Sequence, residues 1–520
     1  MTFPLFRTIL AALTVAALAQ PARAEWHEAA SDHFVIYAND KDSDIRRFAE
    51  NLERYHSAMA VMTKREIEVP SPSNRVVIYV VGGESRMISL ARGDRNVGGF
   101  YIPRAGGSRA FVQTIRNQSG GYPDFSTIIL LHEYAHHFLI GSSSYAMPRW
   151  LSEGAAEFFA AASFNTDGSM LIGRAAQHRA ADLTFADPVH VRELIDPALY
   201  EKQKVKGYDG FYLKSWLLYH YLTFNEARAG QRDAYIRNLT EGMDQLAAGE
   251  AAFGDLDKLE RELKDYVRTR LYSFVLKPEQ LRTGTITLRK LSPGEAAIMP
   301  VQIRSQRGVD AKEAAKLVTE ARAVAAKFPE DAGVLAALAE AEFDAGNDAA
   351  AIAAADAAIA RDPARTNPYV QKGYALFREA AKAEGDKRAA AYAAAVRPFV
   401  ALNKLENDHP LPLIFFYRAQ LERGVAPNEN ARAALERAAI LAPFDHGLRI
   451  EAGAMLAKEG KIELARAFLA PVAANPHGGG AAARAKQLIA ALADAPEGVA
   501  FDARRLPPLV EMPQVALTGD

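Results

Sequence analysis

The chain has 520 residues, and its 62 basic and 63 acidic side chains leave a formal net charge of -1. This length is too great for one compact core, so we expect two or three domains, and the balanced charge gives no support to a nucleic-acid-binding surface. Because the sequence has no cysteine, disulfides and thiol catalysis are excluded, and any metal site must be built from histidines and carboxylates.

Residues 1–24 have the pattern of an export signal. Arg7 precedes an apolar stretch from Ile9 to Ala19, and Ala22-Arg23-Ala24 forms a small-x-small cleavage site. The alternative, an uncleaved anchor, would need roughly 20 apolar residues to cross a bilayer. We therefore expect a cleaved signal peptide, a periplasmic or secreted location, and no stable membrane span after its removal.

The region after the signal mixes short apolar strands with a helix, which predicts an α+β unit over residues 25–118. A hairpin is expected at its end, where two strand-like runs flank a turn that contains two glycines. From residue 119 to 275 helical periodicity dominates. Strands are expected at 33–37, 76–81, 99–103 and 109–113, and a helix at 44–62.

The C-terminal half changes character twice. Residues 276–305 are punctuated by Thr, Pro, Gly and Ser and predict a linker or a small β element. Residues 306–495 are then Ala-rich and helical, and the prolines at helix ends lie 34, then 80, then 33 residues apart. That period is typical of tetratricopeptide (TPR) repeats, with a generic α-solenoid as the alternative. Either array offers a concave surface to a protein or peptide partner.

The chemical signal is His132-Glu133-Tyr134-Ala135-His136, in a stretch typical of a buried helix. Positions i and i+4 lie one above the other, so the imidazoles of His132 and His136 can converge on one ion with Glu133 on the flank. His137 is rotated by about 100° from His136 and is expected to be structural. Catalytic zinc takes three protein ligands and a water, so a third ligand must come from elsewhere.

A second helical segment begins after Pro148 and carries two glutamates at i and i+4. Glu153 can complete the site with His132 and His136. Glu157, one turn further on, can accept a hydrogen bond from a ligand imidazole. The two segments together predict a Zn²⁺ site.

The segments His132-Glu133-x-x-His136 and Trp150-Leu151-x-Glu153-Gly154-x-Ala156-Glu157 resemble those of the gluzincin metallopeptidases, particularly the peptidase MA-like proteins related to thermolysin and the aminopeptidase N group. The resemblance is close over these segments and loose over residues 30–270. It implies an α+β thermolysin-like metallopeptidase domain, a peptide or protein substrate, zinc held by both histidines and the first glutamate of the second segment, and Glu133 as general acid and base.

The sequence departs from the aminopeptidases, because it has no Gly-x-Met-Glu-Asn segment ahead of His132. Aminopeptidase activity is therefore not implied. As in the family, the strand at 111–114 is expected to be the sheet edge that pairs with an extended substrate. Family sites also add an oxyanion donor. Tyr212 is favoured for this role, with Tyr208 and His220 as alternatives, and core packing is the other interpretation of Tyr212.

We therefore expect an exported zinc metallopeptidase whose helical repeats bind a protein or peptide. Two other functions stay open: a catalytically silent periplasmic TPR scaffold that retains the zinc site, and a zinc amidase that acts on cell-wall peptide. The expected order is a signal peptide (1–24), an α+β subdomain (25–118), a helical zinc-peptidase subdomain (119–275), a linker or small β element (276–305), an all-α TPR-like solenoid (306–495) and a C-terminal tail (496–520).

Overall fold

The computed structural model describes residues 25–95, 97–116, 120–142, 145–204 and 207–506. The expected signal peptide and the end of the expected tail, residues 507–520, lie outside these described residues. Within the described part, no helix combines the length and apolarity that a membrane crossing requires.

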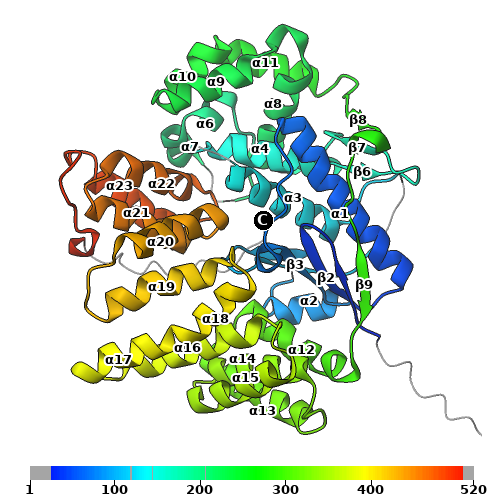
Figure 1. Cartoon of the computed structure of the whole chain (residues 1–520). Coiled ribbons are helices and arrows are strands. Elements are labelled where there is room, and N and C mark those ends of the chain that lie inside the picture. The colour runs from blue at the N-terminus through cyan, green and yellow to red at the C-terminus, as the bar shows by residue number, and fades with distance from the viewer. Residues whose placement is uncertain (1–24, 96, 117–119, 143–144, 205–206, 507–520) are drawn as a thin grey trace, which may run out of the picture.

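A six-stranded sheet underlies the N-terminal part of the chain (Figure 1). Its order is β4-β5-β3-β2-β1-β9, and β2, β3 and β5 are parallel while the other pairs are antiparallel. The strands are β1 (His27–Ala30), β2 (Phe34–Ala38), β3 (Val76–Val80), β4 (Gly99–Ile102), β5 (Arg109–Val112) and β9 (Thr287–Lys290).

The expected hairpin is present as β4 and β5, with Phe100 opposite Phe111. The prediction that residues 111–114 form the sheet edge is wrong. Strand β5 pairs with β3 on one side and with β4 on the other, because the hairpin folds its first strand to the outside. The edge strand of the described sheet beside the metal motif is therefore β4.

Helices cover both faces of the sheet, because successive strand residues point to opposite sides. Phe34 and Ile36 face one core, which they share with helices α1 (Asp42–Thr63) and α3 (Phe125–Ser142). Tyr79 and Phe111 face the other, where they pack with α2 (Glu84–Leu90) and with Met299 of α12. The apolar run that precedes the metal motif thus places α3 directly on the sheet.

The helices after α3 form the upper part of this unit (Figure 1). A small sheet, in the order β6-β7-β8, joins residues before and after them. The elements are α4 (Arg149–Ala160), β6 (Ser163–Phe164), β7 (Met170–Ile172), α5 (Asp182–Phe185), α6 (Val191–Ile195), α7 (Pro197–Gln203), α8 (Phe211–Phe224), α9 (Gln231–Thr240), α10 (Gln245–Phe253), α11 (Leu256–Tyr266) and β8 (Phe274–Leu276).

The C-terminal half is a curved array of antiparallel helices (Figure 1). In the unit that α14 and α15 form, Gly346 makes the turn with a φ of 82°. The array is solenoid-like and fits TPR-like repeats. Its helices are α12 (Pro293–Arg307), α13 (Ala311–Ala325), α14 (Ala332–Asp344), α15 (Asp348–Arg361), α16 (Asn367–Ala381), α17 (Asp386–Ala395), α18 (Arg397–Leu405), α19 (Pro410–Glu422), α20 (Glu429–Leu441), α21 (His446–Lys458), α22 (Ile462–Ala474) and α23 (Gly479–Ala491).

Residues 276–305, expected to be a linker or small β element, are integrated into both parts of the molecule. Strand β9 adds to the N-terminal sheet by pairing with β1, and α12 begins the helical array at Pro293. The described part of the tail, up to residue 506, turns back on the array, where the amide of Phe501 donates to the carbonyl of Ala457.

The array bends back onto the N-terminal part, so that α20 to α23 lie beside the metal-motif helices (Figure 1). Polar contacts between the two parts stabilise this arrangement, among them two that involve backbone groups. The backbone N–H of Ala105 donates to the carboxylate of Asp445 over 2.8 Å, and the side-chain amide of Asn74 donates to the carbonyl of Leu441 over 3.0 Å. The described chain thus folds into two units with a direct interface.

Gly154 controls the approach of α4 to α8. A Cβ there would lie 2.4 Å from the carbonyl oxygen of Ser215, a backbone atom that cannot rotate away. We expect Gly154→Ala to lower the free energy of unfolding by about 1–3 kcal/mol, because overpacking outweighs the better helix propensity of alanine.

Chemical denaturation of Gly154→Ala and Gly207→Ala measures this effect. A Cβ at Gly207 meets no atom within 4 Å, so this control should stay close to the wild type. Equal stability of the two variants would show that α4 and α8 need no glycine between them.

Candidate metal centre

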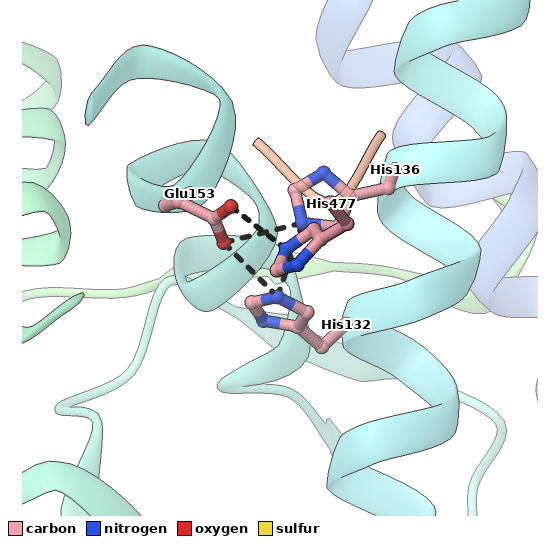
Figure 2. A group of neighbouring side chains, drawn as sticks. All are labelled: His132, His136, Glu153 and His477. Atoms are coloured by element: carbon pink, nitrogen blue, oxygen red, sulfur yellow. Dashed lines mark hydrogen bonds and ion pairs between the residues drawn. The ribbon is translucent and has the colours of Figure 1, made fainter. Parts of the chain in front are cut away.

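Helices α3 and α4 bring the three predicted ligands together (Figure 2). The Nε2 atoms of His132 and His136 are 3.1 Å apart. Oε2 of Glu153 lies 3.3 Å from each of them. His132 and His136 converge because they lie one helical turn apart on α3, and Glu153 faces them from the packed surface of α4.

These three distances match the spacing of ligands around one ion. Ligand atoms that surround zinc tetrahedrally at roughly 2.0–2.1 Å lie about 3.3 Å from one another. In addition, the Glu153 carboxylate is fully buried, and both of its oxygens face imidazole nitrogens, Oε2 those of the two ligands and Oε1 that of His477 at 2.9 Å. A buried carboxylate surrounded by imidazole nitrogens is stabilised by positive charge, and imidazole and carboxylate donors fit Zn²⁺ here.

Both ligand imidazoles are supported at their other nitrogen. Nδ1 of His136 lies 3.2 Å from the hydroxyl of Ser152, and Nδ1 of His132 lies 3.5 Å from the carboxylate of Glu157. Such partners fix the ring orientation and leave Nε2 free for a metal. Glu157 therefore lies where the sequence placed it, and Ser152 is a support that the sequence did not single out.

Glu157 is itself held by two basic side chains. It accepts from Nη2 of Arg179 over 2.7 Å and lies 2.5 Å from Nε2 of His178. Burial alone would raise the pKa of the Glu157 carboxyl, but the Arg179 charge and the His178 hydrogen bond hold it far below its ordinary value. Glu157 thus stays an anion behind His132.

A fourth side chain, His477 of the helical array, joins this cluster (Figure 2). Its Nε2 lies 2.9 Å from Oε1 of Glu153, and one ligand atom from each of the four residues fits within 4.8 Å of the others. Burial lowers the pKa of His477, but the charges of Glu153 and Glu133 outweigh it and raise the pKa to about 9. Sequence reasoning missed His477 because no local pattern links it to the motif.

The charges around Glu153 also determine its state. Burial would raise the pKa of this carboxyl, but the charges of His136 and His477 and the hydrogen bonds with the ligand imidazoles hold it well below its ordinary value. Glu133, next to His132 on α3, lies near Tyr101 of β4 and borders with it a void too narrow for a water molecule.

The candidate oxyanion donors occupy different surroundings. Tyr212 lies beside the cluster, with its ring centre 6.4 Å from that of His132. Tyr208 instead donates to Asp182, and His220 lies 3.0 Å from two backbone carbonyl oxygens and 2.9 Å from the hydroxyl of Tyr266. Of the three candidates, the structure brings Tyr212 to the metal cluster.

His137 points away from the metal cluster, towards β4 and the helical array. Its Nδ1 lies 2.5 Å from the hydroxyl of Tyr101, and its ring centre is 4.4 Å from that of Phe444. Burial lowers the pKa of His137 to about 3, so the ring is neutral and packs like an aromatic side chain.

No protein-family model matches this chain, and none of the curated proteins does. Among the solved structures, it is similar to a thermophilic TPR protein from Thermus thermophilus, with 16% sequence identity and a TM-score of 0.33. The match covers 37% of this chain and 100% of that chain.

Ser152→Ala should weaken zinc binding, because it leaves Nδ1 of His136 buried without its partner. We expect the zinc dissociation constant to rise roughly tenfold, measured by competition with a chromophoric chelator. Ser163→Ala is the matched control, since Ser163 is also buried but its hydroxyl has no hydrogen-bond partner among the described residues. The same dissociation constant in both variants would contradict the role of Ser152.

Proposed function

We propose that this protein is an exported zinc-dependent hydrolase of peptide bonds with a thermolysin-like catalytic unit of the gluzincin type. The observation that carries the proposal is the triangle of His132, His136 and Glu153, with Glu133 beside the first ligand on the same helix. Two further features support it. Each ligand imidazole has a partner at Nδ1, and Tyr101 of the edge strand β4 lies near Glu133.

Zinc in this site would lower the pKa of a coordinated water towards about 7 and polarise the scissile carbonyl. Glu133 takes the proton of the attacking water and passes it to the leaving amine. Tyr212 donates a hydrogen bond to the oxyanion. Burial, aided by the charge of Glu153, raises the pKa of Tyr212, so its hydroxyl keeps the proton it must donate.

The substrate would bind along β4, because an edge strand recognises an extended peptide through its backbone groups. The sequence predicted that the substrate would pair with residues 111–114. Pairing with β4 instead would put the substrate one strand further from the centre of the sheet. The TPR-like array supplies the partner surface, since concave helical arrays bind peptides and proteins.

A scaffold that keeps its zinc but does not hydrolyse is the second candidate. The position of His477 favours it, because structural zinc sites have four protein ligands whereas catalytic sites keep one position open. The proposed peptidase activity therefore has to be tested in a protein whose metal content is known.

Glu133→Gln should abolish hydrolysis while zinc stays bound. Losing a general base commonly lowers the rate by about 10²- to 10⁴-fold, and glutamine keeps the size of the side chain without its basicity. We expect this loss with a fluorogenic casein substrate, together with one zinc per chain by elemental analysis. Glu201→Gln removes an exposed carboxylate that pairs with Lys204, and it should behave as wild type. Undiminished activity of zinc-loaded Glu133→Gln would refute the mechanism.

Tyr212→Phe isolates the oxyanion donor. Its ring would stay near the guanidinium groups of Arg149 and Arg179, whose Cζ atoms lie 5.9 and 4.6 Å from the ring centre. Because the hydrogen bond forms in the transition state, kcat should fall by about 10²- to 10³-fold with little change in KM. Steady-state kinetics of the purified variant gives both constants. A rise in KM alone would assign Tyr212 to substrate binding, and no change in either constant would leave it a packing residue.

A further inference from the structure

His477 lies in the turn between α22 and α23, and the turn is built to present it. The backbone N–H of His477 donates to Oδ1 of Asn475 over 2.8 Å. The amide nitrogen of Asn475 lies 2.9 Å from Nε2 of His446 at the start of α21. Asn475 thus ties the turn to the array, while the half-exposed imidazole of His477 extends across the interface to Glu153.

The neighbouring contacts hold the array where His477 can reach the cluster. Phe444 packs against His137, one residue beyond a predicted ligand on α3, with ring centres 4.4 Å apart. Asp445, next in sequence, accepts from the backbone of Ala105. The ring centre of His477 is then 5.5 Å from that of His136. The approach of His477 is therefore part of a packed interface between the two units.

We propose that His477 is a fourth metal ligand, and that the docked array closes the metal centre into a His₃Glu site. This inference rests on the metal site of the proposed function, but not on hydrolysis. Its basis is geometric: one ligand atom of His477 lies within 4.8 Å of a ligand atom of each of His132, His136 and Glu153.

A four-ligand site has a direct consequence for catalysis. Catalytic zinc sites keep one coordination position for water or substrate, whereas closed sites do not. With His477 in place, Glu133 has no activated water to deprotonate, so the docked form is latent. Hydrolysis therefore requires that the turn carrying His477 moves away from Glu153. The position of the helical array would in this way regulate the activity.

A cysteine at position 477 tests the ligand directly, because the natural chain has no cysteine. A thiolate bound to Co²⁺ gives an intense charge-transfer band in the near ultraviolet, and the natural ligands of this site give none. We expect this band in cobalt-loaded His477→Cys at one metal per chain. His190→Cys is the control, because His190 is also half-exposed but pairs with Glu260 of another helix. It should show no such band.

His477→Ala tests both the affinity and the closed state. Removing a ligand should raise the zinc dissociation constant by more than the roughly tenfold that follows from removing an outer hydrogen-bond partner. The visible spectrum of the cobalt protein should also change as one nitrogen donor is replaced by water. In zinc-saturated protein the rate of casein hydrolysis should rise above that of the wild type, while His190→Ala should match the wild type in all three measurements.

The outcomes separate this inference from the proposed function. Cobalt-loaded His477→Cys without a charge-transfer band, together with an unchanged spectrum in His477→Ala, would overturn the fourth ligand. Equal hydrolysis by the wild type and His477→Ala would overturn the latent state. A thiolate band with no hydrolysis in any variant would support the fourth ligand and refute the peptidase, leaving a closed structural metal site.

Discussion

The structure depends on one electrostatic constraint, the burial of the Glu153 carboxylate beside two imidazoles. A buried charge is very costly unless it is paired, so α3 must hold His132 and His136 within reach of α4. The resulting triangle has sides of 3.1 to 3.3 Å. Helix α4 packs closely on α8 at Gly154, the residue next to Glu153. This packing fixes the position of the Glu153 carboxylate.

A second buried carboxylate repeats this constraint one turn further along α4. Glu157 is paired with Arg179 and His178 and lies behind His132. Glu153 and Glu157 therefore have different roles, although both are fully buried. Glu153 faces the imidazole nitrogens of His132, His136 and His477, whereas Glu157 is neutralised by the guanidinium of Arg179. The i, i+4 spacing in the sequence predicts where the two glutamates lie on α4. Their different roles follow from the side chains that each glutamate contacts.

The predictable part of the site was the part determined by helical periodicity. His132, His136 and Glu153 lie on two helices close in sequence, and i, i+4 geometry suffices to align them. The helical array was predictable for the same reason, because its prolines and small residues recur at the repeat period. Ser152 could have been found as the neighbour of Glu153 on a helix that faces His136.

The features that could not be predicted from the sequence depend on contacts between segments that lie far apart in the chain. The edge strand was misplaced because hairpin periodicity does not say which strand pairs with β3. Strand β9 could not be assigned to the sheet, since its partner β1 lies near the start of the chain. His477 was missed because only the docking of the whole array brings its turn to α4.

With His477 as a metal ligand, docking of the array and metal binding would be two coupled equilibria. Coupling between two binding events is reciprocal, so the free energy that docking adds to metal binding is the same free energy that metal adds to docking. With His477 as a ligand, a partner that draws the array away from Ala105 and His137 would weaken metal binding as it opens the site. Activation and metal retention then oppose each other, and the three ligands of α3 and α4 must alone hold the ion in the open form. The support of both imidazoles by Ser152 and Glu157 is the feature of the structure that meets this requirement.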